Sequence, residues 1–304
     1  MGVLLSISGN RYPGADGKAL VDLARRAEDA GFDGIVVADH VVMGQQTDQY
    51  PWGKFPIPED MPWPEPLTIL TAIAAVTERL RLCTGVLIAP LRPAIVLAKA
   101  AATLDALSSG RLELGVAVGW QREEFDAAGL NFTARGRMLD DNMGACRALW
   151  QPGFATFDSE TVTFDGIRCD PQPATPGGPP LLFAGTLNAR NLRRIIVMGD
   201  GWIPIMGERA QGVGDGVTTL REAMLKAGRE PANLRIRIEL PTVWNGNHPD
   251  LAATLAGAPA FAELGATDTS VVLSAFVRDR AQSADWFAEA ARLLSALTPG
   301  PQPG

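Results

Sequence analysis

A regular alternation of short apolar segments with stretches of helical periodicity runs through this chain, and it constrains the fold more than any other feature. Eight apolar segments predict strands, and all but one of them are followed by a convincing helical pattern. Such alternation is typical of βα units that build a parallel sheet. Eight units in 304 residues without a linker favour one closed (β/α)8 barrel over an open, doubly wound sheet. We expect a single barrel domain over residues 1–298 and a disordered, proline- and glycine-rich tail over residues 299–304.

The element boundaries follow from the local patterns. Strands are predicted at residues 3–8, 34–38, 80–88, 111–119, 180–185, 200–205, 234–241 and 267–274. Helices are predicted at residues 18–31, 67–78, 94–110, 135–150, 189–199, 209–227 and 285–297, with an inserted hairpin around residues 161–170. Residues 43–66 are rich in proline and glycine and carry Tyr50, Trp52 and Phe55. Loops of this length are usually functional.

The composition excludes several classes of partner. A net charge of -7 and a pI near 5.0 leave no basic field to attract nucleic acid or an anionic membrane surface, so we expect neither as a partner. The three cysteines are far apart, which argues against a disulfide framework and fits a reducing cytoplasm. We expect neither export nor membrane insertion, because no leader and no sufficiently long apolar stretch is evident. Two histidines cannot supply the ligands of a metal-dependent hydrolase, so no metal site is expected.

An acid and an imidazole stand side by side after the second predicted strand. The chemistry of a (β/α)8 barrel takes place at the C-terminal ends of its strands, so Asp39 and His40 are expected at the barrel mouth. We expect His40 to transfer protons and the neighbouring Asp39 to orient it. The alternative is a structural histidine that binds a neighbouring loop. The other histidine, His248, follows a polar segment and is expected on the solvated surface.

Three other strand ends have features of a ligand site. Gly85 ends the third strand, where a glycine marks either a close approach of ligand to backbone or a simple turn. Gly115 and Gly119 bracket the end of the fourth strand and precede Trp120, without the spacing of a dinucleotide fingerprint. Residues 183–186 precede a helix whose N-terminal amides could bind a phosphate. The arginines of that helix are expected on a solvated face instead: Arg190, Arg193 and Arg194.

Three segments resemble one known family. The run TERLRLCTGVLIAPLRPAIVLAKAAATLDALSSGRLELGVAVGWQREEF, residues 77–125, strongly resembles the bacterial luciferase-like family of flavin- and deazaflavin-dependent oxidoreductases. So do ADH after the second strand and GDGWIP at residues 199–204, and the resemblance spans about residues 15–205. It implies a (β/α)8 barrel with insertions that binds FMN or the deazaflavin coenzyme F420 at its mouth. Members of the family are often dimers, so the resemblance also implies a homodimer.

The resemblance implies roles for particular residues. Asp39 and His40 match the pair that lies against the deazaflavin ring in the glucose-6-phosphate dehydrogenase branch. Gly85 and Val86 match a non-proline cis peptide, a bulge that backs the ring. The other residues assigned to the cofactor are Gly119, Glu123, Ala184, Gly185 and Thr186.

Trp120 departs from that branch, which has a catalytic glutamate at this position, and Glu123 stands where the branch has an asparagine. The indole N–H only donates a hydrogen bond, so Trp120 cannot replace the acid. It can present a large apolar face to a flat substrate. We therefore expect Trp52 and Trp120 to bind the substrate, and His40, Asp39 and Glu123 to be the catalytic residues.

These features predict a cytoplasmic oxidoreductase that moves a hydride between coenzyme F420 and a small, apolar organic substrate held under residues 50–63. One alternative is an FMN-dependent monooxygenase of the same family, in which reduced flavin activates oxygen. A second alternative is a barrel that binds or carries flavin without catalysis. Such a carrier would not obviously need the Asp39–His40 pair.

We predict that the protein does not oxidise glucose 6-phosphate with F420. Trp120 replaces the acid, and residues 234–241 and 267–274 offer acids and hydroxyls where a phosphate needs a basic cluster. The measurement is the rate of F420 reduction with this sugar phosphate. Robust turnover would contradict the prediction, whereas a Trp120→Glu variant that gained the activity would support it.

Overall fold

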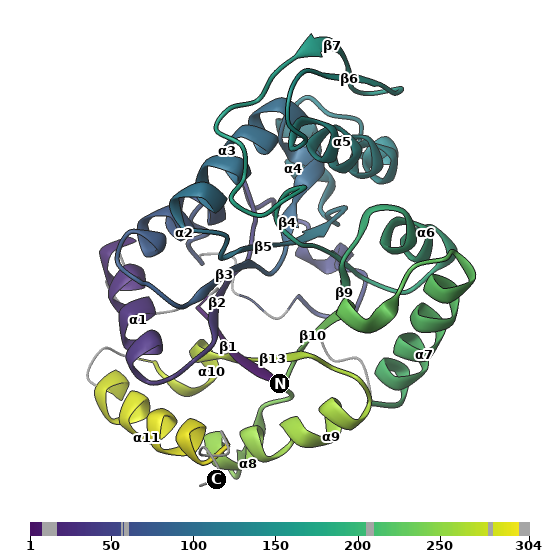
Figure 1. The fold of residues 1–304 in the computed structure, drawn as a ribbon. Coiled ribbons are helices and arrows are strands. Elements are labelled where there is room, and N and C mark those ends of the chain that lie inside the picture. Colours follow the sequence, from purple (N-terminus) through teal and green to yellow (C-terminus); the bar gives the residue numbers. More distant parts are fainter. Residues whose placement is uncertain (8–16, 56, 58–60, 205–209, 279–281, 298–304) are drawn as a thin grey trace, which may run out of the picture.

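The computed structural model shows a closed barrel of parallel strands surrounded by helices (Figure 1), as the alternation predicts. It describes residues 1–7, 17–55, 57, 61–204, 210–278 and 282–297. The barrel strands are β1 (Gly2–Ser6), β2 (Gly34–Val37), β3 (Arg81–Thr84), β4 (Leu87–Ile88), β5 (Leu112–Ala117), β8 (Leu181–Ala184), β9 (Gly201–Ile203), β10 (Arg235–Glu239) and β13 (Asp268–Val272). The order is β3-β2-β1-β13-β10-β9-β8-β5-β4, and β3 also pairs with β5, which closes the ring. Because β3 and β4 share one position, the barrel has the eight predicted strand positions.

Amphipathic helices cover the outside of the barrel (Figure 1). Helix α1 (Gly17–Asp29) shows why: its buried residues Leu20, Leu23, Ala24 and Ala27 recur at helical spacing and lie on one face. The other large helices are α2 (Pro66–Ala74), α3 (Ala94–Leu107), α5 (Arg135–Leu149), α6 (Ala189–Met198), α7 (Ala210–Lys226) and α11 (Gln282–Leu297). The boundaries of each helix agree with those of a predicted helical segment to within a few residues at either end.

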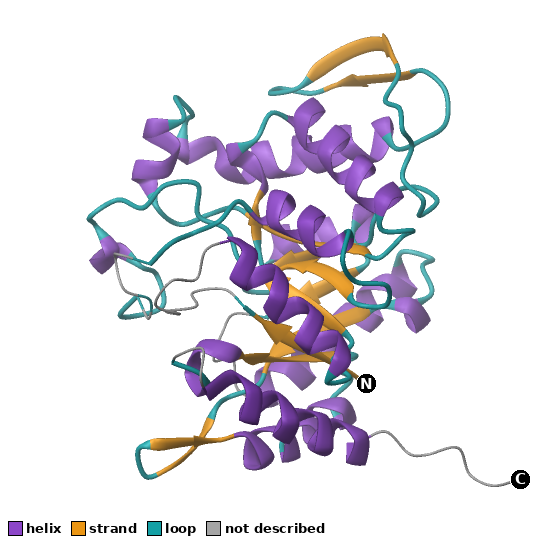
Figure 2. Ribbon diagram, turned by 90° about the vertical axis from the view of Figure 1, so that its left-hand side faces the viewer, coloured by secondary structure: helices purple, strands orange, loops and turns teal. Residues whose placement is uncertain are grey.

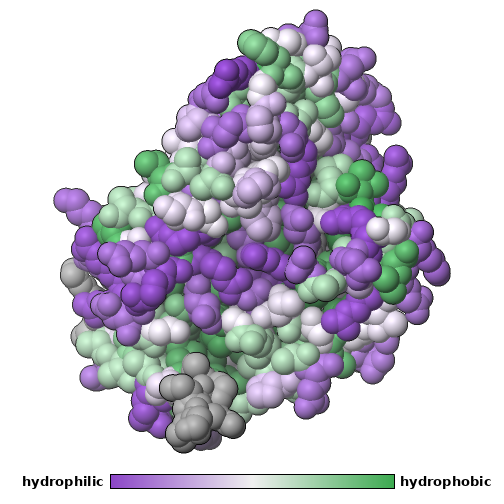
Figure 3. All heavy atoms as spheres, in the orientation of Figure 1, coloured by the Kyte–Doolittle hydropathy of each residue, from purple (hydrophilic) through white to green (hydrophobic). Residues whose placement is uncertain are grey.

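Charged side chains fill the N-terminal end of the barrel interior. Glu113 of β5 forms ion pairs with Arg81 of β3 and with Arg235 and Arg237 of β10. Arg81 also pairs with Asp268 of β13. Figure 3 shows hydrophilic side chains across the middle of this face of the molecule. The interior is therefore packed at this end, and an open site is left at the opposite end, where the loops that follow the strands gather (Figure 2).

The seventh βα unit differs from the sequence prediction. Strand β10 is followed by a hairpin of β11 (Val243–Asn245) and β12 (His248–Asp250) and then by two short helices, α8 (Leu251–Ala256) and α9 (Ala258–Glu263). These helices are not evident in the sequence, because each is too short to show a periodic pattern. His248 is exposed in the hairpin, as predicted.

The structure also differs from the sequence prediction in smaller details. The inserted hairpin exists, but its strands are β6 (Ala155–Asp158) and β7 (Thr163–Ile167), so it begins earlier than residue 161. The last predicted strand ends at Val272, where the short helix α10 (Leu273–Phe276) begins, and helix α4 (Arg122–Ala127) was not predicted. Both helices are only a turn or two long, and their periodicity is too weak to detect. The tail over residues 299–304 lies outside the described residues.

Among the residues that the structure describes, no helix is both long and apolar enough to cross a membrane.

Candidate active site at the barrel mouth

A cavity of about 370 Å³ opens at the C-terminal ends of the barrel strands. Its volume is in the range of small-molecule sites. It brings together every site residue predicted from the sequence except Glu123: Asp39, His40, Trp52, Gly85, Val86, Gly119, Trp120, Ala184, Gly185 and Thr186. These residues come from four separate strand ends and from the long loop after β2, which is how a barrel assembles one site from distant segments.

The strand over residues 80–88 is interrupted at the cavity wall. The peptide bond between Gly85 and Val86 is cis, which confirms the prediction made for it. The interruption separates β3 from β4, and both residues line the cavity. A side chain at Gly85 would collide with the Val36 side chain, so glycine is required there.

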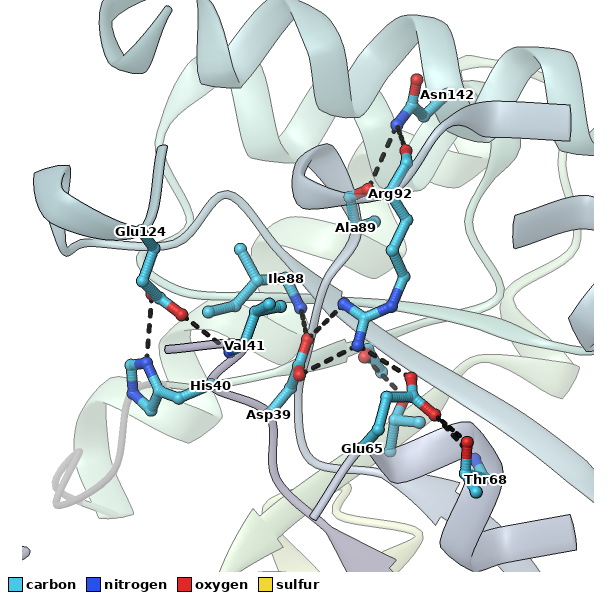
Figure 4. A network of polar contacts seen from close by, with 12 residues as sticks. Asp39, His40, Val41, Glu65, Thr68, Ile88, Ala89, Arg92, Glu124 and Asn142 are labelled. Atoms are coloured by element: carbon cyan, nitrogen blue, oxygen red, sulfur yellow. Dashed lines mark hydrogen bonds and ion pairs between the residues drawn. The ribbon is translucent and has the colours of Figure 1, made fainter. Parts of the chain in front are cut away.

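His40 is held by a carboxylate from the other side of the mouth. Its Nδ1 lies 3.1 Å from Oε2 of Glu124 in helix α4, and both side chains are buried. The second oxygen of Glu124 accepts a 2.9 Å hydrogen bond from the Val41 backbone N–H, which fixes the carboxylate (Figure 4). Because an ionised carboxylate only accepts hydrogen bonds, Nδ1 of His40 donates. Nε2 has no hydrogen-bond partner among the described residues, so it can exchange a proton with a bound ligand.

Asp39 does not orient His40, contrary to the expectation. Its carboxylate forms a bidentate ion pair with Arg92, at 2.6 and 3.0 Å, and accepts a 2.9 Å hydrogen bond from the Ile88 N–H. Consecutive residues in an extended segment point in opposite directions, so Asp39 and His40 reach different partners (Figure 4). Burial alone would lower the pKa of Arg92, but its hydrogen bonds to Asp39 and Glu65 raise it, and the guanidinium stays charged.

Glu123 does not line the cavity, whereas its neighbour Glu124 contacts the predicted proton-transfer residue His40. Successive residues of a helix point about 100° apart, so only one of two adjacent glutamates in α4 can face inward. Glu123 faces the loop after β2 and accepts a hydrogen bond from the Gln46 N–H. Its position gives no support to the catalytic and cofactor-binding roles expected of it.

Aromatic rings form the apolar wall of the cavity. The Trp120 ring lies 5.2 Å from those of Tyr50 and Phe55 and 5.9 Å from the His40 imidazole, measured between centroids. Trp63 lies closer to His40, at 4.6 Å. Trp52 lines the cavity from the loop and is 49% exposed, so it stands at the entrance. The predicted loop aromatics thus meet Trp120 and His40 in one cluster.

A polar wall lies at the start of helix α6. Asn188 caps this helix, and Asn191 donates hydrogen bonds of 3.3 Å to the carbonyls of Ala184 and Thr186, which holds the loop between them. The side-chain oxygen of Asn191 is buried and has no hydrogen-bond partner among the described residues. Asn191 was not predicted as a site residue, since a single asparagine inside a helix gives no signal in the sequence.

The arginines of helix α6 differ from one another. Arg190 and Arg193 are exposed, as predicted, but Arg194 is buried and lines the cavity. Arg190 and Arg194 both contact Asp140. Arg194 therefore brings a guanidinium group to the polar wall, where Asp140 holds it in place.

Like Asn191, Glu239 lines the cavity but was not predicted as a site residue. It ends β10 and lines the cavity. Burial raises its pKa to about 7. Its signal in the sequence was the alternation in RIRIE, residues 235–239, which places Arg235, Arg237 and Glu239 on the same face of the strand.

We predict that Arg92→Ala lowers the free energy of unfolding by about 3 kcal/mol, because it leaves the Asp39 carboxylate buried without its partner. Urea denaturation monitored by tryptophan fluorescence measures the change. The control is Arg25→Ala, which removes an exposed ion pair with Asp22 and should change stability by less than about 0.5 kcal/mol. Equal stability of the two variants would contradict the structural role given to Arg92.

Comparison with known proteins agrees with this geometry. A family model described as luciferase-like monooxygenase matches residues 1–303. The uncharacterized protein Rv0953c of Mycobacterium tuberculosis (strain ATCC 25618 / H37Rv) is 34% identical over 250 residues, which are 81% of this chain and 83% of that protein.

Two solved structures share the fold. Monooxygenase RslO1 from Streptomyces bottropensis has a TM-score of 0.75 at 18% identity, and the match covers 97% of both chains. An F420-dependent secondary alcohol dehydrogenase in complex with an F420-acetone adduct has a TM-score of 0.71 at 14% identity, covering 98% of both chains. With the family match and the 34% identical relative, these findings lead to one conclusion: the chain belongs to the luciferase-like monooxygenase family.

Proposed function

We propose that this protein is a coenzyme F420-dependent oxidoreductase that transfers a hydride between the deazaflavin and a small, apolar organic substrate. The family consists of oxidoreductases and monooxygenases, so the protein is an enzyme of that broad kind. The observation that carries the finer proposal is the His40–Glu124 pair, which presents one imidazole nitrogen to a cavity walled by aromatic rings. A related fold in an F420-dependent secondary alcohol dehydrogenase supports it.

The cavity fits a planar ring with a phosphate-bearing tail. Gly85, Val86 and Gly185 offer backbone surface to a flat ring, and a side chain added at Gly185 would meet only open space. The start of helix α6 offers backbone amides and the guanidinium of Arg194 to a phosphate group, and the Asn191 oxygen, which has no partner among the described residues, to a hydroxyl group. FMN and F420 both have this form, and we propose F420 because the cavity adds a proton-transfer group to an apolar substrate wall.

The bound deazaflavin would supply the hydride-transfer chemistry. The protein supplies the rest. His40 Nε2 holds or accepts the proton that accompanies the hydride, and Glu124 keeps the imidazole in the required orientation. Tyr50, Phe55 and Trp120 exclude water from the reacting face and pack against an apolar substrate.

An FMN-dependent monooxygenase is the second candidate. The likeness to monooxygenase RslO1 favours it, because that structure matches over nearly the whole chain. The same wall of backbone and the same positive charge would hold FMN. The two candidates differ in their reaction with oxygen, since reduced flavin reacts with it and reduced deazaflavin reacts poorly.

We further propose a cytoplasmic homodimer. All three cysteines are free and buried, which is compatible with a reducing compartment.

The proposal is tested by titrating the purified protein separately with F420 and FMN. Absorbance and fluorescence changes of the cofactor and quenching of the cavity tryptophans report binding. We expect saturable binding of F420 that is tighter than that of FMN, and slow oxidation of the bound, reduced cofactor in air. Tight FMN binding with rapid oxygen consumption would identify the monooxygenase instead.

We predict that His40→Ala lowers turnover by about 10²–10⁴-fold, the range typical of a lost acid–base group. Cofactor affinity and the unfolding midpoint should change little, because the side chain faces the cavity rather than the packed wall. The matched control is His248→Ala, which removes the exposed histidine of the β11–β12 hairpin and should leave turnover unchanged. A His40→Ala variant that unfolds, or that retains full turnover, would show that His40 is structural.

A further inference from the structure

Among the described residues, two carboxylates line the cavity, and their surroundings differ. Asp39 is neutralised by the bidentate ion pair with Arg92. Glu239, at the end of β10, has no ion pair and no hydrogen bond to its carboxyl from any of the described residues. It is an acid that lines the cavity and lacks a protein partner there.

The groups around Glu239 come from the elements packed beside it. Strand β13 places Ser270 directly opposite Glu239 in register, and strand β9 brings no titratable side chain. The loop after β2 brings Tyr50, whose pKa is raised by burial and by the negative charge of Glu239. On its own strand, Arg237 binds Glu113 at 3.2 Å and the Thr84 carbonyl at 2.6 Å. Thus the guanidinium of Arg237, which neighbours Glu239 on the same face of the strand, is already bound to other groups.

Burial without a cationic partner favours the neutral form of a carboxyl. The pKa of Glu239 is raised to about 7 by this cause, so the group is protonated in about half of the molecules at neutral pH. A protonated carboxyl can donate one hydrogen bond, which an ionised one cannot. The cavity therefore has a donor at the end of β10, while His40 projects from the segment after β2, three strand positions around the barrel.

We propose that Glu239 in its acid form is a substrate-binding group that donates a hydrogen bond to the carbonyl oxygen of a neutral α,β-unsaturated carbonyl compound. The inference rests on the proposed function and names its substrate class. Ser270 and Tyr50 contribute hydroxyl groups to the same subsite. The apolar part of the substrate packs against Phe55 and Trp120.

This substrate class matches the roles that we propose for His40 and Glu239 in the cavity. Reduction of the carbon–carbon double bond would move a hydride from a C–H bond of reduced deazaflavin to the β-carbon and a proton from Nε2 of the imidazolium form of His40 to the α-carbon. The C=C π-bond, that C–H bond and the Nε2–H bond would break, two new C–H bonds would form, and the deazaflavin would be left oxidised and His40 neutral. The carbonyl oxygen stays in its hydrogen bond to Glu239 throughout. At Glu239 an anionic substrate would meet an acid whose neighbouring cation, Arg237, is already paired with Glu113, and an ammonium group would require the ionised form that burial disfavours.

The test measures ligand binding rather than turnover. The probe is 2-cyclohexen-1-one, and cyclohexylammonium and cyclohexanecarboxylate are matched charged probes of similar size. Ligand-observed NMR gives the affinity of each for the full chain, alone and with oxidised F420, which cannot donate a hydride. We expect the affinity for the enone to fall about tenfold from pH 6 to pH 8, because only the protonated fraction of Glu239 binds it.

Substitutions identify the responsible group. Glu239→Gln retains a donor and should bind the enone with an affinity that no longer depends on pH. Glu239→Leu removes the donor and should bind about tenfold more weakly at pH 6, with no further loss at pH 8. The control Glu263→Gln changes an exposed acid at the end of α9 and should behave like the unaltered protein.

Three results would overturn the inference: an enone affinity that rises with pH, a Glu239→Leu variant that binds like the unaltered protein, or tighter binding of cyclohexylammonium than of the enone. The last would identify a cation site. Because binding is measured without catalysis, these results are separable from a failure of the proposed function, which would appear as an absence of F420 binding.

Discussion

The ion pair between Asp39 and Arg92 is the interaction on which the rest of the barrel mouth depends. It joins the end of β2 to the segment before α3, and Asp39 also holds the end of β4 through Ile88. Arg92 extends the network to Glu65, which caps helix α2, and its carbonyl accepts a hydrogen bond from Asn142 of α5 (Figure 4). Removal of either charge would leave the other buried, so these elements are fixed together.

That network does not involve the His40 side chain, which leaves it free for the proton transfer that we propose for it. A single acid serving both as a structural anchor and as the partner of the imidazole would couple stability to catalysis. Here the tasks are divided, with Asp39 anchoring the wall and Glu124 holding His40. The rigid wall also positions the Gly85–Val86 segment, because Ile88 follows it closely in the chain. Preorganisation of this kind is what an enzyme needs to hold a proton donor in place.

The fold was predictable because eight apolar segments with helical patterns between them leave few alternatives. The location of Asp39 and His40 at the barrel mouth was also predictable, because it follows from their place after a strand. The cis bond between Gly85 and Val86 was predictable from the resemblance to the family. What the sequence could not provide were contacts between distant segments. Which of Glu123 and Glu124 contacts His40 depends on the orientation of the short helix α4. The lack of a partner for the Glu239 carboxyl among the described residues depends on the segments packed around it.

The charged floor of the barrel has a kinetic consequence. Among the described residues, Glu113 and its three arginines close the N-terminal end, so a ligand that enters the cavity would leave through the mouth. When two ligands share one entrance, the one seated more deeply must arrive first and depart last. In the proposed enzyme, cofactor and substrate would therefore exchange in a compulsory order, and the residence time of the outer ligand would limit the release of the inner one.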